Sequence, residues 1–125
     1  CSSEATFIDG KLSSLGYWSQ HKVKSFSRNQ RKLLWAAIKC TKPGGLIVYS
    51  TCTLSPEENE WVIHKTLEKH PEVTLEPISW KGIKRLPILK SWHGKSFDPC
   101  LQGALRIFPD GWVQGFFICC LRKRQ

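Results

Sequence analysis

A cysteine at position 52 stands where an apolar run ends and an acidic segment begins. The run Leu46–Ser50 is rich in β-forming residues, and Ser55–Glu58 carries the signals that start a helix. A thiol between the end of a strand and the positive end of a helix dipole is favoured as the thiolate, which is the reactive form. The pattern indicates that Cys52 is a nucleophile, and a buried structural cysteine is the alternative that composition alone favours.

The other cysteines suggest a reduced protein. A second cysteine opens the chain in Cys1–Glu4, and the sequence contains no methionine, so we expect a piece of a longer protein. Six cysteines without a CxxC spacing or a secretory signal predict a cytoplasmic protein with no disulfide partner and no metal. Apart from Cys1 and Cys52, we expect most cysteines to be small buried hydrophobes.

The positive charge is unevenly distributed. The net charge is +9, no acid occurs from Gly10 to Pro56, and only bases occur among the charged residues from Lys81 to Lys95. Such asymmetry fits a polyanionic partner, RNA or DNA. A solvated basic surface explains the charge alone equally well. No apolar run is long enough to span a bilayer, so we expect no membrane partner.

The elements around Cys52 read as half of a parallel α/β unit. Ser27 is a candidate cap for a helix to about Cys40, with an apolar stripe of Leu33, Leu34, Ala37 and Ile38. The segment 42–45, with its proline and two glycines, ends the helix, and Leu46–Ser50 suits a strand buried on both faces.

The downstream half alternates between one helix and several strands. Ser55 and Glu58 form a candidate capping box with Pro56 at the first helical position, and His70-Pro71 ends that helix. Strands are predicted over residues 73–78, 104–108 and 116–121, and residues 79–103 read mostly as loop.

The segment Lys42–Glu60, KPGGLIVYSTCTLSPEENE, closely resembles the Nol/Nop/Sun family of RNA cytosine-5 methyltransferases. Cys1–Glu4 resembles the end of the family's Asp-Ala-Pro-Cys-Ser motif, and Gln30 matches the segment between the two motifs. Arg106, Pro109 and Gly115–Ile118 resemble the last family motif, so the similarity runs along nearly the whole chain and is weakest over 79–103.

The resemblance implies a covalent mechanism. Position 5 of cytosine is a poor nucleophile, and a thiolate added at position 6 turns the ring into an enamine that can attack an electrophilic methyl group. The family takes this methyl group from S-adenosylmethionine. Carried over, Cys52 is the nucleophile and Cys1 assists release of the product.

The resemblance also implies the fold. We expect residues 1–125 to be the C-terminal half of a Rossmann-like class I methyltransferase domain, an α/β fold whose parallel sheet has an antiparallel edge strand. The family's glycine-rich cofactor loop lies upstream of these residues, so none of them is assigned to cofactor binding. We therefore expect this fragment alone to be inactive and to bind S-adenosylmethionine weakly.

RNA is the expected substrate, with ribosomal RNA preferred over transfer RNA on family resemblance alone. Candidate substrate-binding residues either flank the two motifs or belong to the basic segment: Thr51, Asn59, Arg106, Lys22, Lys24 and Arg28. Asn59 could instead orient the Cys52 turn. Departures from the family pattern occur at Ser3, Ala5, Asp110, Gln114 and Cys120. The last three support an alternative, a non-catalytic methyltransferase-like RNA-binding module; a purely structural fragment is a third.

Other side chains have simpler interpretations. Glu57, Glu58 and Glu60 could act as acid/base carboxylates, but helix capping explains Glu57 and Glu58. The four histidines lack the spacing of a metal site and are expected at the surface. The six tryptophans are expected in the core or as loop anchors, with base stacking by Trp92 or Trp112 as the alternative.

Overall fold

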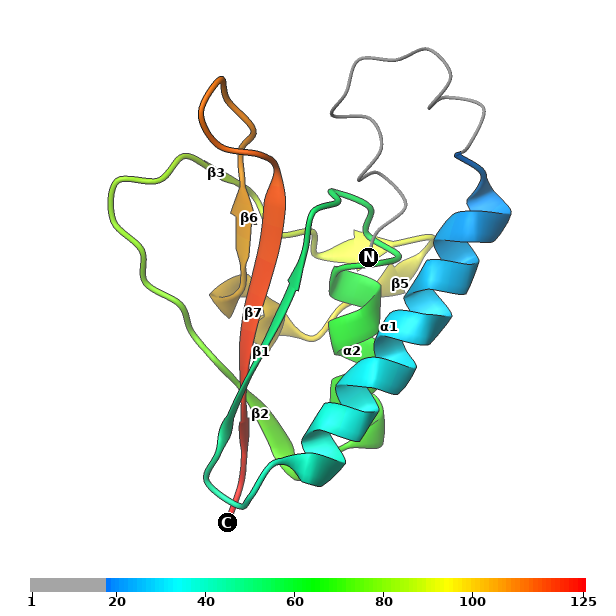
Figure 1. The fold of residues 1–125 in the computed structure, drawn as a ribbon, viewed down its shortest axis with the longest axis vertical. Helices are drawn as coiled ribbons and strands as arrows, with labels where there is room; N and C mark the ends of the chain where they lie inside the picture. Colours follow the sequence, from blue (N-terminus) through cyan, green and yellow to red (C-terminus); the bar gives the residue numbers. More distant parts are fainter. Residues whose placement is uncertain (1–17) are drawn as a thin grey trace.

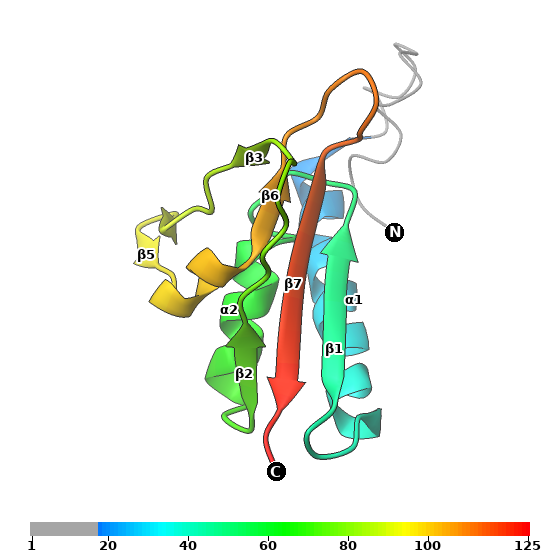
Figure 2. The ribbon, with the colours of Figure 1, turned by 90° about the vertical axis from the view of Figure 1, so that its left-hand side faces the viewer.

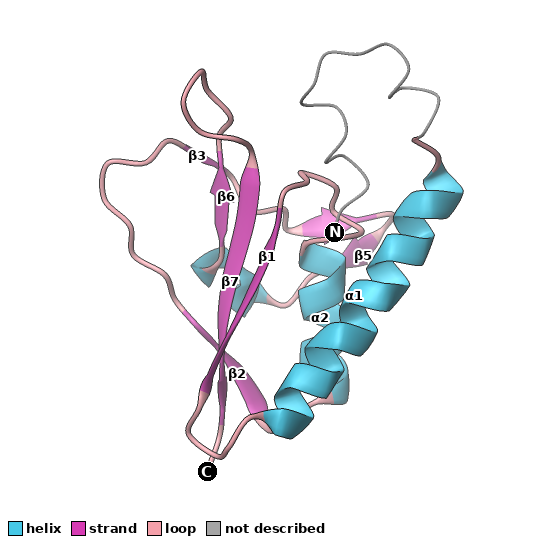
Figure 3. Cartoon of the chain, viewed as in Figure 1, coloured by secondary structure: helices cyan, strands magenta, loops and turns pink. Residues whose placement is uncertain are grey.

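A twisted sheet with two helices on one face forms the body of the molecule in this computed structural model, which describes residues 18–125. The helices are α1 (Gln20–Cys40) and α2 (Glu60–Lys69). The main sheet contains β1 (Leu46–Thr51), β2 (Val73–Glu76), β3 (Arg85–Leu86), β6 (Leu105–Ile107) and β7 (Phe116–Lys123). A separate hairpin pairs β4 (Ser91–Trp92) with β5 (Lys95–Ser96), and a short 3-10 helix, η3, spans Pro99–Gly103. Figure 3 shows how these elements alternate with loops.

The long strand β7 is the centre of the sheet. It pairs with β1 along one side and with β6 and β2 along the other, and β6 also pairs with β3. Every pairing among residues 18–125 is antiparallel, so β1 and β2 run in the same direction on opposite sides of β7. The predicted α/β fold is present and β6 and β7 form the expected antiparallel pair, but β7 is an interior strand. The parallel pairings that we predicted are not found in the described part.

Helix α1 begins earlier than its sequence suggested. Ser19, and not Ser27, is the N-cap, and its hydroxyl accepts a hydrogen bond from the backbone N–H of Lys22 (3.2 Å). No proline or glycine interrupts the extra turns, and Val23 and Ser27 continue the buried stripe at helical spacing. The Ser27 hydroxyl donates to the backbone carbonyl of Glu57 (2.6 Å), so it ties the helix to the loop before α2.

Strand β1 is buried on one face only. Ile47, Tyr49 and Thr51 face the helices and are buried, whereas Leu46 and Val48 on the other face are 55% and 67% exposed. Figure 2 shows this face of the sheet, with both helices behind the strands. Our prediction of a strand buried on both faces is wrong for this chain, because nothing in residues 18–125 covers that face of β1 or pairs with its outer edge.

Helix α2 begins later than predicted. Residues 56–59 form a turn, and the helix starts at Glu60 with Asn59 as its cap. The expected capping box is absent, because the Ser55 hydroxyl donates to the Glu57 carboxylate (2.9 Å) and the Glu58 carboxylate accepts from the Gln30 side-chain amide (2.9 Å). The fully buried Glu58 carboxylate therefore points toward α1.

The core lies between the sheet and the two helices. Leu34 and Ile38 of α1 and Val62 and Ile63 of α2 pack against the strands, whereas Leu33 of the predicted stripe is 71% exposed. The buried strand residues of this core are Ile47, Tyr49, Val73, Phe117, Cys119 and Leu121.

Several expectations about single residue types are corrected. Of the described cysteines only Cys119 is buried, and Cys40 and Cys100 are exposed. Trp18, Trp80 and Trp112 are also exposed, and Trp112 is 98% exposed. Within the described residues no helix is long and apolar enough to cross a membrane. In the same part of the chain, no three histidine, cysteine, aspartate or glutamate side chains gather to hold a metal ion.

Candidate active site

The Cys52 thiol lies directly after the carboxyl end of β1, as the sequence predicted. It is half-buried and not part of a disulfide. It lines a cavity of about 500 Å³ that follows the outer edge of β1, together with Thr51, Gln30 and Phe116.

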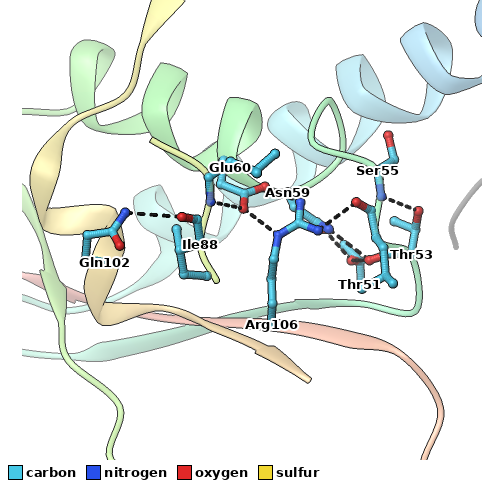
Figure 4. Close-up of polar contacts among 10 residues, drawn as sticks. Thr51, Thr53, Ser55, Asn59, Glu60, Ile88, Gln102 and Arg106 are labelled. Carbon is cyan, nitrogen blue, oxygen red and sulfur yellow. Dashed lines mark hydrogen bonds and ion pairs between the residues drawn. The ribbon is translucent and has the colours of Figure 1, made fainter. Parts of the chain in front are cut away.

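Residues 51–55 form the segment around Cys52 that we call the Cys52 turn. The buried amide of Asn59 holds this segment on both sides of Cys52. Its oxygen accepts a hydrogen bond from the Thr51 hydroxyl (2.5 Å), and its nitrogen donates to the carbonyl of Thr53 (2.8 Å). The Thr53 hydroxyl in turn accepts from the backbone N–H of Ser55 (3.0 Å). Figure 4 shows these contacts converging on the turn. Because Asn59 and Thr53 are fully buried, these hydrogen bonds hold the residues on either side of Cys52 in place relative to α2.

A buried ion pair holds the far end of the same turn. The Arg106 guanidinium contacts both carboxylate oxygens of Glu60, from Nε to Oε1 (2.6 Å) and from Nη2 to Oε2 (2.7 Å). Its Nη1 also donates to the backbone carbonyl of Leu54 (2.9 Å). A planar guanidinium suits such multipoint contact. The pair therefore joins β6, α2 and the Cys52 turn (Figure 4).

Contacts from α1 and β1 hold the segment between the turn and α2. The Tyr49 hydroxyl donates to the carbonyl of Glu58 (2.5 Å), whose carboxylate is bound by Gln30. Burial, and then the Glu58 charge, raise the pKa of Tyr49 well above its usual range, so this hydroxyl remains a donor at neutral pH.

The structure divides the predicted site residues into two groups. Thr51, Asn59 and Arg106 are buried around the Cys52 turn and are bonded within the protein. Lys24 and Arg28 are exposed on α1, where they line a second cavity, and Lys22 is half-buried on the same helix. A substrate contact by any of these residues stays a prediction. Cys1 lies outside the described residues.

The sequence indicated Glu60 only as a possible acid/base carboxylate and gave Gln30 no role. Glu60 is fully buried, although a helix start needs no third acid after Glu57 and Glu58. This third acid was the one feature of the sequence that could have indicated a buried charged residue at position 60. Gln30 was matched to a family segment, but its partner Glu58 is 28 residues away, and this separation cannot be read from local spacing.

Asp110, one of the residues that depart from the family pattern, has a structural role. Its carboxylate accepts the backbone N–H groups of Trp112 (2.9 Å) and Val113 (2.8 Å), closing the loop between β6 and β7. These hydrogen bonds lower the pKa of Asp110 below its usual range. The residue is therefore an acceptor that shapes this loop. Gln114 is exposed in the same loop, and Cys120 is half-buried in β7.

The sheet, the helices on its face and the cysteine at a strand end define a methyltransferase-like α/β fold, as solved structures show. The methyltransferase homolog protein from Pyrococcus horikoshii aligns with a TM-score of 0.74 and 37% identity, over 84% of this chain and 33% of that one. NSun6 from Pyrococcus horikoshii with SFG gives a TM-score of 0.64 and 34% identity, over 87% and 26%.

Residues 11–122 match the family described as 16S rRNA methyltransferase RsmB/F, and the chain belongs to that family. The expected Nol/Nop/Sun membership is confirmed. The tRNA (cytosine(49)-C(5))-methyltransferase of Pyrococcus abyssi is 38% identical over 107 residues, which are 85% of this chain and 34% of that protein. The ribosomal RNA small subunit methyltransferase F of Erwinia tasmaniensis is 32% identical over 124 residues, or 98% and 24%. The chain thus spans about a third or a quarter of the length of these relatives.

Proposed function

We propose that this chain is the C-terminal portion of the catalytic domain of an S-adenosylmethionine-dependent RNA cytosine-5 methyltransferase, with Cys52 as the nucleophile. The observation that carries the proposal is the placement of Cys52. The residues on both sides of it are held by Asn59, while Cys52 itself is half-buried at the carboxyl end of β1 and is not part of a disulfide. A nucleophile needs this combination of fixed geometry and access.

The proposed reaction begins when the Cys52 thiolate forms a bond to C6 of a cytosine that has been turned out of its stack. The displaced ring electrons make C5 nucleophilic, and C5 then accepts the methyl group. Loss of the C5 proton to a base restores the double bond and expels the thiolate. Family resemblance gives Cys1 a role in this last step.

S-adenosylmethionine would supply the electrophilic methyl group. Residues 18–125 contain no glycine-rich loop between a strand and a helix, so they do not fit the main binding site of this cofactor. We propose that this site is formed by residues outside the chain. That NSun6 was solved with SFG supports a cofactor site in the larger proteins of this family.

The missing portion of the domain would pack against β1. The outer edge of this strand has no partner within residues 18–125, and the apolar side chains of Leu33, Leu46 and Val48 are exposed near it. A parallel strand added at this edge would produce the predicted parallel sheet and would cover an apolar surface that is costly to leave in water. We propose that the substrate is RNA, with ribosomal RNA preferred over transfer RNA, and that the protein acts in the cytoplasm.

The test is covalent trapping in a protein extended upstream to include the proposed cofactor half. With 5-azacytosine in the RNA, position 5 carries no proton to lose, so the thiolate adduct cannot be released. We expect a protein–RNA adduct on denaturing gels, no adduct with Cys52→Ala, and an unchanged adduct with Cys40→Ala, which alters an exposed cysteine at the end of α1. With ordinary cytosine, Cys1→Ala should accumulate the adduct.

RNA binding without any adduct would contradict the catalytic proposal and favour the non-catalytic RNA-binding module. Adduct formation by Cys52→Ala would contradict the assignment of the nucleophile while leaving the activity in place.

A further inference from the structure

A second cavity lies beside the Cys52 turn, between the first half of α1 and the β4–β5 hairpin. It has a volume of about 670 Å³, and we call it the basic groove. One wall is the α1 face that carries Lys24, Arg28 and Arg31, and the other wall carries Trp92 and His93 of the hairpin. Trp61 of α2 also lines it.

The groove is positively charged because its lysine and arginine side chains, all from α1, outnumber its one carboxylate. Helix α1 contains no acidic residue, and the hairpin lies in the acid-free segment from Lys81 to Lys95. The carboxylate that lines the groove, Glu57, faces the His93 imidazole at 3.7 Å. The Lys24 and Arg28 side chains are exposed where they line the groove. The groove therefore offers cationic donors that an anionic ligand can use.

The opposite wall presents aromatic rings in a fixed hairpin turn. The Trp92 and His93 rings meet edge to face, with centroids 5.0 Å apart. The turn between β4 and β5 has positive φ at both central residues, 48° at His93 and 75° at Gly94. Such a turn favours asparagine and glycine, and histidine is another residue that adopts the left-handed region. It places an imidazole at the mouth of the groove, next to an indole.

The groove is continuous with the turn that holds Cys52. A smaller depression of about 460 Å³ is lined by Leu54, Ser55 and Pro56 of that turn. Glu57 and Trp92 line both the depression and the basic groove. A strand lying in the groove would therefore extend toward the residues that follow Cys52.

We propose that the basic groove binds the single-stranded RNA that flanks the target cytosine. Phosphates lie against Lys24, Arg28 and Arg31, and one unstacked base packs on Trp92 and His93. This inference rests on the proposed function, because it assigns the groove to the same substrate. Aromatic faces opposite a cationic helix suit unpaired nucleotides, which supply a phosphate and a flat ring at regular intervals. An acidic peptide would use the cations and leave the aromatic wall without a matched partner.

The experiment measures fluorescence anisotropy of a short labelled single-stranded RNA with the upstream-extended protein, at several salt concentrations. Each lost phosphate contact should reduce the slope of log affinity against log salt by about 0.7. The double variant Lys24→Ala, Arg28→Ala should therefore reduce it by about 1.4. Lys39→Ala is the matched control, since this exposed lysine lies in the last turn of the same helix, outside the groove.

The aromatic wall is tested separately. Trp92→Leu should weaken binding by about tenfold, as expected for a lost base stack, and Trp92→Phe should restore most of it. His93→Ala changes an exposed residue and gives a second measure without disturbing the core. Polyglutamate should not compete with the RNA.

Unchanged affinity and salt slope in the double variant would overturn the proposal, as would equal competition by polyglutamate, which would mark an acidic-protein site. The adduct assay separates this outcome from failure of the proposed function. A protein that still traps 5-azacytosine RNA through Cys52 but ignores the groove variants has the activity without this binding site.

Discussion

Arg106 and Glu60 form a two-point ion pair in the interior, although 46 residues separate them in the sequence. The Glu60 side chain is fully buried and that of Arg106 is 7% exposed. Glu60 also accepts the backbone N–H of Leu89 (3.2 Å), so its carboxylate joins α2 to β6 and to the loop before β4. The ion pair therefore connects the Cys52 turn to strand β6 of the sheet.

Breaking this pair from one side should be strongly destabilising. Arg106→Ala leaves a buried carboxylate without its counter-charge, and we expect the free energy of unfolding to fall by about 3–5 kcal/mol. Urea unfolding followed by circular dichroism measures this loss. The double variant Arg106→Met, Glu60→Leu removes both charges and should lose less than Arg106→Ala alone. An additive loss would show that the two side chains act independently.

Asn59 should matter more to Cys52 than to overall stability. Asn59→Ala removes the hydrogen bonds to the Thr51 hydroxyl and the Thr53 carbonyl and leaves these two groups only their long mutual contact (3.3 Å), at a cost of about 1–3 kcal/mol. The same substitution frees the turn, so the yield of the Cys52–RNA adduct should fall further than unfolding explains. Thr66→Val is the matched control, because Thr66 is equally buried and accepts from the Trp35 indole (3.2 Å) away from the turn. Equal adduct yields in the two variants would contradict a positioning role.

Local patterns predicted the position of Cys52 but not the means that hold it. The strand and the loop after it follow from β-propensity and turn residues within ten positions of each other. The starts of α1 and α2 were predicted wrongly because the serines that resembled caps form other hydrogen bonds. The Ser27 hydroxyl donates to the backbone carbonyl of Glu57, and the Ser55 hydroxyl donates to the Glu57 carboxylate. Local propensity cannot reveal such tertiary competition.

The open face of β1 was mispredicted for a different reason. An apolar run predicts burial, and the sequence cannot show whether the covering elements belong to the same stretch of chain. The basic groove was likewise unpredictable as a cavity, although the basic residues of α1 and the aromatic residues of the hairpin were visible in the sequence. Their meeting depends on how the β4–β5 hairpin folds back toward α1, across a region that reads as loop.

Cys100 should alkylate slowly despite its exposure. Burial of its sulfur, together with the hydrogen bond and charge of Asp98, raises the pKa of Cys100 to about 12. The thiolate is the reactive form. At pH 8 the rate of alkylation by iodoacetamide should therefore be lower at Cys100 than at the exposed Cys40 by a factor of about ten or more. Because pH 8 lies below that pKa, the rate at Cys100 should rise steeply with pH. Mass spectrometry of the alkylated peptides measures both rates.

Asp98→Asn is the corresponding control for Cys100. Asparagine keeps an oxygen for the backbone N–H of Cys100, which Asp98 accepts at 2.9 Å, and removes the negative charge. The pKa of Cys100 should fall and its alkylation at pH 8 should accelerate. An unchanged rate would show that burial alone protects the thiol.

The exposed face of β1 gives a test of the proposed missing half. Val48 is 67% exposed in this chain, so Val48→Ser should change the unfolding free energy of residues 1–125 by about 0.5 kcal/mol or less. In the upstream-extended protein the same side chain is covered, and its loss should cost about 1–3 kcal/mol. Ile47→Ala, on the face that is already buried, should be equally destabilising in both proteins. If Val48→Ser is neutral in both, the added portion packs elsewhere and the proposed completion of the sheet at β1 is wrong.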